Sequence, residues 1–156
     1  MKKHLFSITA ISLWFISVVV VATFFIKGNT ETSDDQRLAV ILKPMERNFV
    51  LAEMRMLLEG VQGITAGLAA GDMKQVSVSA RRIGMASAVD VNPSLMLKLP
   101  LEFKQQGMAV HKQFDQLADM ADSGESPSKL TAILAEQLSA CVACHSIYSL
   151  KAEPAE

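Results

Sequence analysis

The hydrophobic pattern of this chain begins with one unbroken apolar run. Lys2 and Lys3 are followed by residues 5–26, which contain no charged side chain. As a helix rising about 1.5 Å per residue, this run covers about 33 Å, enough to cross the hydrocarbon core of a bilayer. A cleaved secretion signal usually has a shorter apolar part and small residues at its cleavage site. The run therefore predicts an uncleaved signal anchor over residues 1–27, with a cleaved signal as the alternative.

Beyond a short polar linker at residues 28–35, apolar positions recur mostly at steps of three and four, the period of amphipathic helices. Gly71 with Asp72, the break Val91–Ser94 and the turn Ser123–Pro127 divide this pattern into four segments. No segment alternates as a half-buried strand does. The stripes contain Leu38, Leu42, Met45, Val50, Met54, Leu57, Val61, Ile64 and Leu68; Val76, Ala80 and Ile83; Phe103, Val110, Phe114, Leu117 and Ala121; and Leu130, Leu134 and Leu138.

Four amphipathic helices joined by mostly short turns predict an all-α fold. Antiparallel packing of neighbouring helices would give a four-helix bundle. The expected organisation is one N-terminal transmembrane helix, a linker, a bundle domain over residues 36–150 and a short tail at residues 151–156.

The fourth stripe continues into the only two cysteines of the chain. It runs from Leu138 through Cys141 and His145, within the sequence Cys-Val-Ala-Cys-His. This is the C-x-x-C-H motif that attaches c-type haem. Residues three and four apart on a helix are neighbours, so two thiols can reach the two vinyl groups of one porphyrin while the histidine faces the iron. The motif therefore predicts one covalent haem c.

Three other interpretations of the motif are weaker. A disulfide between Cys141 and Cys144 would not need the histidine. A thioredoxin-like pair normally opens a helix that follows a strand, whereas this pair lies late in a helical segment. A zinc site needs about four ligands. The only other histidines are His4, within the apolar N-terminal region, and His111.

Composition and charge narrow the class of protein further. The net charge of -1 offers no basic face for nucleic acid. Nine methionines suit a helical core and also offer thioether ligands to iron. The lysine pair before the apolar run predicts a cytoplasmic N-terminus. We therefore expect a single-pass protein of the bacterial inner membrane with its haem domain in the periplasm, or a soluble periplasmic protein if the apolar run is cleaved.

The combination of four helices and a C-terminal C-x-x-C-H resembles the cytochrome c′ family, including its low-spin members. Tyr148 follows His145 by three residues and matches that family's ending C-x-x-C-H-x-x-Tyr. The basic residue that commonly follows the tyrosine is replaced here by Ser149, and Lys151 stands two residues later. The resemblance covers about residues 36–150, and this chain differs from typical soluble members by its anchor.

The resemblance implies roles for individual residues. Cys141 and Cys144 would form the thioether bonds, and His145 would be the proximal iron ligand. In low-spin relatives a methionine of the first helix is the sixth ligand, and Met54 fits best because apolar residues follow it at three, seven and ten positions. Met56 is the alternative, about 160° away around a helix, so both cannot face the haem. A sixth position that is open or otherwise filled is the third alternative.

Three more residues are candidates for the haem surroundings. His111, at the edge of the third stripe, can bond a haem propionate, approach the distal side, or be a partly exposed histidine without a ligand role, which we favour. Arg47 and Arg55 can pair with propionates, because a guanidinium matches a carboxylate, or remain solvated.

The leading functional hypothesis is a membrane-anchored c-type cytochrome that passes single electrons between redox partner proteins. The alternative is a high-spin, gas-binding haem protein of the cytochrome c′ type that binds NO or CO. A haem-free bundle acting as a partner module is a third hypothesis. We do not expect an enzyme, because no acid–base constellation accompanies the motif. Homodimers are common in the resembled family, although no pairing surface is evident in the sequence.

Overall fold

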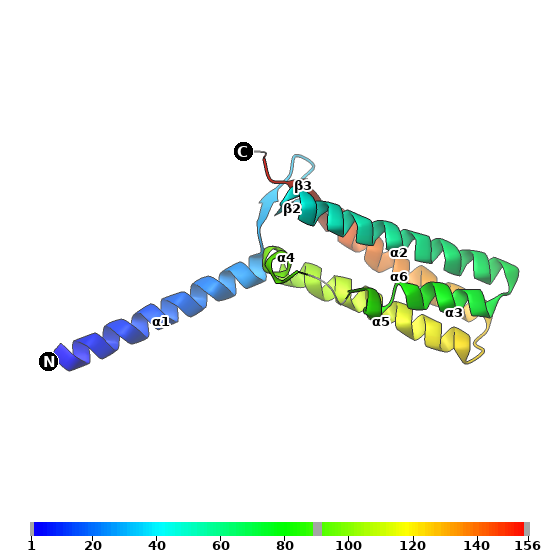
Figure 1. Ribbon diagram of the computed structural model, residues 1–156, viewed down its shortest axis with the longest axis horizontal. Coiled ribbons are helices and arrows are strands. Elements are labelled where there is room, and N and C mark those ends of the chain that lie inside the picture. The colour runs from blue at the N-terminus through cyan, green and yellow to red at the C-terminus, as the bar shows by residue number, and fades with distance from the viewer. Residues whose placement is uncertain (1, 89–91, 155–156) are drawn as a thin grey trace.

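The computed structural model describes residues 2–88 and 92–154 (Figure 1). These residues are mostly helical (77%) and form six α-helices, one 3₁₀ turn and three short strands. The predicted helical class and the apolar N-terminal helix are therefore confirmed. The elements are α1 Lys2–Lys27, β1 Thr30–Thr32, β2 Leu38–Leu42, α2 Pro44–Ala70, α3 Met73–Arg82, the 3₁₀ turn Met85–Ala88, α4 Pro93–Lys98, α5 Leu101–Asp122, α6 Pro127–Ile147 and β3 Tyr148–Ala152.

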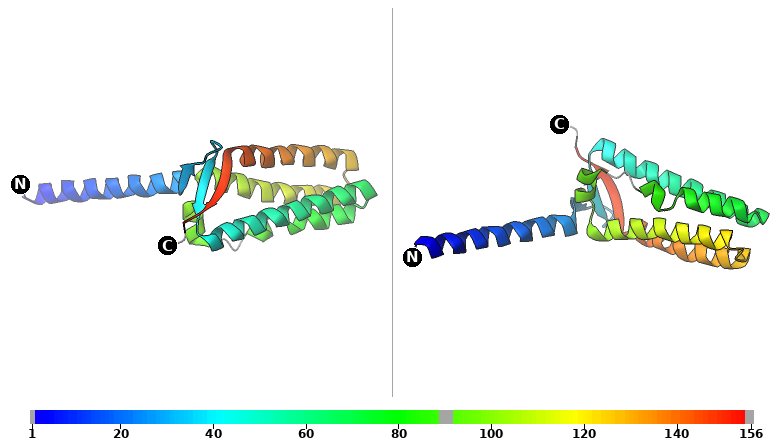
Figure 2. Two further views of the ribbon diagram at one scale, coloured as in Figure 1. Left: turned by 90° about the horizontal axis from the view of Figure 1, so that it is seen from above. Right: turned by 60° about the horizontal axis from the view of Figure 1, so that its bottom comes forward.

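Helix α1 extends away from the rest of the chain (Figures 1 and 2). Its large apolar side chains from Ile8 to Ile26 are exposed. Within the described residues, α1 and α6 are the two helices long and apolar enough to cross a membrane. Leu130 and Leu134 of α6 are buried in the core, whereas none of the apolar window of α1 is buried. Helix α1 is therefore the candidate membrane span.

Helices α2, α3, α5 and α6 lie side by side around one core (Figure 2). The buried side chains of α3 are small: Val76, Ser77 and Ala80. Gly60 of α2 has no room for a Cβ, which would lie 2.5 Å from the Ile83 side chain. The buried residues of this main core are Ile64, Val76, Ala80, Ile83, Phe114, Leu117, Ala118, Ala121, Leu130 and Leu134.

The helix boundaries follow the predicted caps. Gly71 ends α2 in a left-handed conformation, at φ 69°, which glycine adopts without strain. The Asp72 carboxylate accepts a hydrogen bond from the Gln75 N–H and caps α3. The Ser126 hydroxyl accepts one from the Lys129 N–H and caps α6, with Pro127 at the first helical position. These two interhelical turns are therefore confirmed.

The prediction that no strand is present is wrong. Leu38–Leu42, expected as the start of the first helix, forms strand β2, which pairs antiparallel with β1 and parallel with β3. This short apolar run fits a buried strand or a buried helix equally well, so periodicity could not distinguish them. Val40 and Leu42 are fully buried, and Pro44 fixes the actual start of the helix.

The sheet also changes the expected boundaries of the domain. Strand β1 lies within the expected linker 28–35, and β3 runs into the expected tail 151–156, so both segments take part in the fold. Of the predicted break at Val91–Ser94, Val91 lies outside the described residues. The following loop contains the short helix α4, which is capped by Asn92.

A charged cluster closes the sheet end of the domain. The Nζ of Lys98 lies 2.7 Å from an oxygen of Glu46 in α2 and 3.0 Å from an oxygen of Glu153 after β3. Burial opposes ionisation of Glu46, but hydrogen bonds from Lys98 and from the Lys43 backbone hold the pKa of its carboxyl below the ordinary value. The cluster therefore ties α4, α2 and the C-terminal strand together as long as Glu46 is ionised.

Lys98→Met is expected to lower the free energy of unfolding at neutral pH by about 1–3 kcal/mol, because it leaves a partly buried carboxylate without its cationic partner. Since the folded-state pKa of Glu46 is depressed, the stabilisation is complete above the ordinary value of 4.5 and is lost as the pH falls through the folded-state pKa. The difference from wild type should therefore shrink in acid. Urea unfolding in detergent, at neutral pH and near pH 3, measures it. Lys112→Met, at an exposed site on α5, is the control, and a pH-independent difference would contradict the assignment.

Candidate functional site

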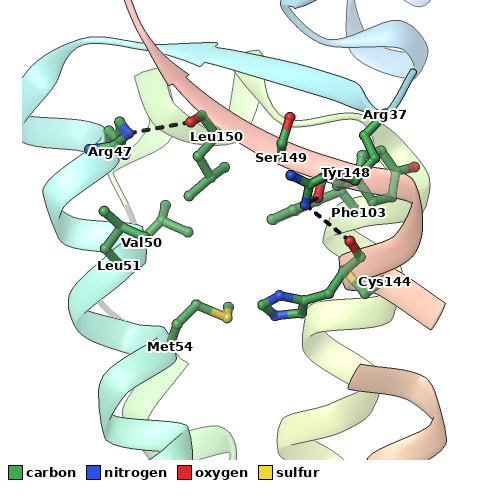
Figure 3. A pocket seen from close by; sticks show the side chains of 11 residues that line it. Arg37, Arg47, Val50, Leu51, Met54, Phe103, Cys144, Tyr148, Ser149 and Leu150 are labelled. Carbon is green, nitrogen blue, oxygen red and sulfur yellow. Dashed lines mark hydrogen bonds between the residues drawn. The ribbon is translucent and has the colours of Figure 1, made fainter. Parts of the chain in front are cut away.

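A cavity of about 290 Å³ lies at the sheet end of the domain, between α2, α5 and the last turn of α6 (Figure 3). We call it the motif cavity because two residues of the C-x-x-C-H motif line it. Its wall is mainly apolar. It is lined by Arg37, Arg47, Val50, Leu51, Met54, Phe103, Cys144, His145, Tyr148, Ser149 and Leu150.

The end of α6 is fixed by Tyr148, which directly follows the helix. Its backbone turns to an extended conformation, and its N–H donates to the carbonyl of Cys144. The ring is buried and packs edge-on against Phe103 of α5, with 5.3 Å between centroids. Burial raises the pKa of the Tyr148 phenol, and the nearby Glu102 carboxylate adds to this. The residue that completes the C-x-x-C-H-x-x-Tyr pattern therefore anchors the motif to α5.

The two cysteines are free and partly buried on the last two turns of α6. Cys144 lines the motif cavity. Cys141 lies one turn earlier, with its Sγ 3.9 Å from the Gln137 carbonyl oxygen, and is not part of the cavity wall. Burial raises the pKa of both thiols. A thioredoxin-like pair needs a lowered thiol pKa, so this environment does not favour redox exchange.

The structure separates the two candidate methionines. The Met54 side chain points into the motif cavity, whose wall also contains His145 (Figure 3). Met56 packs instead against the main core. Met54 is therefore the methionine that shares a cavity with the motif histidine. Met45, from the start of the predicted stripe, is exposed.

Arg37 is a residue of the site that the sequence did not reveal. Its Nη1 donates to the carbonyl oxygens of His145 (3.2 Å) and Tyr148 (3.3 Å). Its Nε donates to Asp35 at 2.7 Å, and this bond holds the pKa of that carboxyl well below its usual range. Arg37 precedes β2, and only the pairing of β2 with β3 brings it beside the motif. No local pattern in the sequence indicates that pairing.

The two predicted propionate partners differ in position. Arg47 lines the motif cavity and its Nε donates to the Leu150 carbonyl oxygen at 3.4 Å. Arg55 is exposed and is not among the lining residues. A propionate role is therefore supported for Arg47 and not for Arg55.

The expectation of a partly exposed His111 is wrong. This side chain is only 8% exposed, and its Nδ1 lies 2.9 Å from the Ile83 carbonyl oxygen. That carbonyl follows the end of α3, where helical partners are missing, so the imidazole N–H donates to it. His111 lines a second cavity of about 100 Å³ that shares Val50, Met54 and Phe103 with the motif cavity. Because it does not line the motif cavity itself, a propionate role is not supported.

The chemistry of the motif cavity fits haem c. A thiol, an imidazole, a thioether and the Arg47 guanidinium surround an apolar space, and these are the kinds of group that attach, ligate and neutralise this cofactor. The guanidinium of Arg37 is already paired with Asp35. In the described part of the chain, no group of three or more His, Cys, Asp or Glu residues is placed to hold a metal ion directly. A haem iron takes at most two protein ligands and needs no such group. Comparisons with protein-family models, curated proteins and solved structures find no match to this chain.

Proposed function

We propose that this chain is a membrane-anchored c-type cytochrome with a cytochrome c′-like four-helix bundle, which carries one covalent haem and transfers single electrons on the periplasmic side of a bacterial inner membrane. One observation carries the proposal: the histidine and second cysteine of a C-x-x-C-H motif line an apolar cavity into which Met54 also points. When bound, haem c supplies an iron that alternates between the ferric and ferrous states.

Different residues at the cavity would attach and ligate the haem. Cys141 and Cys144 would fix the ring by thioether bonds, and His145 would provide the axial nitrogen. Met54 would provide a sulfur ligand from α2, and a His/Met pair gives a higher potential than two nitrogen ligands. Because both ligands lie on long packed helices, little rearrangement is expected when one electron is gained or lost.

The remaining wall would control the surroundings of the cofactor. Val50, Leu51 and Phe103 line the cavity with apolar side chains that would surround the ring. His145 and the neighbouring helix end are exposed, which leaves one side accessible to redox partner proteins. A single electron would enter from a reduced partner and leave to an oxidised one through this side.

Arg47→Leu is expected to lower the reduction potential by a few tens of millivolts, because a nearby cation favours the form with one more electron. Arg55→Leu, two turns along the same helix and outside the cavity, should leave the potential unchanged. A spectroelectrochemical titration of both holoproteins makes the comparison. Equal potentials for the two variants would contradict the placement of Arg47 beside the haem.

The second candidate function is binding of NO or CO by a high-spin haem. The second cavity, of about 100 Å³, favours gas binding, because Met54 lines both cavities. A displaced Met54 side chain or a diatomic gas therefore has room next to the motif cavity. The spectrum of the oxidised and reduced holoprotein separates the two functions. A near-infrared sulfur-to-iron band indicates methionine ligation and electron transfer, whereas a high-spin spectrum with rapid CO uptake indicates gas binding.

The proposal itself is tested by producing the full chain in a host with a cytochrome c maturation system. The intact mass should exceed the polypeptide mass by one haem, and alkaline pyridine should give a haemochrome with the colour typical of thioether-bound haem. A chain of polypeptide mass without haemochrome would overturn the proposal.

A further inference from the structure

The last turn of α1 is held by a buried lysine of the domain. Lys104 on α5 is 8% exposed, and its Nζ lies 3.2 Å from the carbonyl oxygens of both Phe25 in α1 and Met96 in α4. The same Nζ lies 3.7 Å from the centroid of the Phe25 ring. Both carbonyls belong to final helical turns, where acceptors lack partners and the helix dipole is negative. Burial lowers the pKa of Lys104.

The residues directly after α1 are bonded to the domain as well. Gly28 has φ 66°, and a Cβ there would lie 2.4 Å from the Lys98 carbonyl oxygen and 2.6 Å from the Pro100 nitrogen. Both are backbone atoms that cannot move aside. The Asn29 N–H donates to the Lys98 carbonyl oxygen at 2.7 Å, and its backbone carbonyl accepts from the Ile41 N–H at 2.8 Å. No flexible segment therefore separates α1 from α4 and β2.

This junction lies at the same end of the domain as the haem motif. Helix α1 meets α4 and the start of α5, beside the sheet into which α6 leads (Figures 1 and 2). On α5, Lys104 contacts α1 while its neighbour Phe103 lines the motif cavity and contacts Tyr148. Leu97 and Met45, at this end, are 61% and 84% exposed. Exposed apolar side chains next to a membrane span suit the headgroup region of a bilayer.

We propose that α1 is retained in the mature protein and docks rigidly on the domain, so that it is neither a cleaved signal nor a flexible tether. In this position it holds the sheet end of the domain against the bilayer surface. Cleavage before residue 28 would take away the Phe25 carbonyl and ring, two of the three groups that the Lys104 Nζ contacts. The docking does not depend on the proposed function. Its consequence does: the motif cavity would face membrane-resident redox partners in one fixed orientation.

Hydrogen–deuterium exchange tests the docking, measured on the full-length chain from a host with a cytochrome c maturation system and placed in lipid nanodiscs. Peptides covering residues 26–31 should exchange at least about tenfold more slowly than an unstructured peptide, because the Asn29 N–H is bonded to α4. The intact mass of the membrane-extracted chain should include residues 2–27. Exchange at the unstructured rate, or a mature chain that begins after Phe25, would overturn the proposal.

Two variants, each with a matched control, test which contacts protect the junction from exchange. Gly28→Ala and Lys104→Met should each increase exchange at the junction about tenfold or more. Gly71→Ala has the same backbone strain, at φ 69° but with open space around it, and Lys112→Met removes an exposed cation from the same helix. Neither control should change exchange at the junction. The proposal fails if Gly28→Ala or Lys104→Met exchanges there as slowly as its control.

Haem content of the same samples separates this proposal from the proposed function. A protected junction in a chain without haem would defeat the cytochrome assignment alone. A fully haem-loaded chain with an unprotected junction would defeat the docking alone.

Discussion

The double variant Cys141→Ala/Cys144→Ala is expected to lose all covalently bound haem. No other cysteine exists in the chain, so no thioether bond can form elsewhere. The expected results are an intact mass equal to that of the variant polypeptide without haem and a denaturing gel without haem peroxidase staining. This is the largest effect predicted for any substitution, because it removes the attachment rather than a ligand.

The single variants refine this expectation. Cys144→Ala removes the thiol that lines the motif cavity, and Cys141→Ala removes the one a turn earlier, so each should leave at most one thioether bond and a lower yield of holoprotein. His145→Ala should keep the covalently bound haem while changing the spectrum, since the role proposed for this side chain is ligation. Val142→Ala, at an exposed position between the two cysteines, is the control and should mature normally. Covalent haem in the double variant would refute the assignment.

The parts of this fold that local chemistry determines were predictable from the sequence. The interhelical turns depend on single residues, such as Gly71 with its left-handed backbone and Pro127 at a helix start, so they can be read directly. Cys144 and His145 line one cavity because they are neighbours on the last turn of a helix, whereas Cys141 lies a turn earlier and does not line it. Strand β2 was not predictable, because its five apolar residues carry no period and its parallel partner β3 lies at the other end of the sequence.

Contacts between segments far apart in the sequence were missed. Arg37 reaches the His145 carbonyl only because β2 lies beside β3. Lys104 reads as an ordinary exposed lysine on a helix, and its burial depends on where α1 and α4 end. Met54 was not missed: the helical period showed that Met54 and Met56 cannot both face the haem, the family resemblance favoured Met54, and Met54 is the one that lines the cavity.

Met54→Leu is expected to abolish the near-infrared sulfur-to-iron band of the oxidised holoprotein and to produce a high-spin spectrum. Leucine keeps the volume and apolar character of methionine, so packing along the cavity wall should change little. The sulfur ligand alone is lost, and with it the higher potential that a thioether gives. We expect the reduction potential to fall on the order of 100 mV and CO binding to appear.

Met56→Leu is the matched control, because it makes the same substitution on the same helix at a side chain that packs against the main core. Its spectrum, potential and inertness to CO should equal those of wild type, with an unfolding free energy changed by less than about 1.5 kcal/mol. A spectral change in Met56→Leu, or an unchanged spectrum in both variants, would remove Met54 as the ligand. A wild-type protein that is already high-spin and binds CO rapidly would favour gas binding, since Met54 would then line an open sixth position without occupying it.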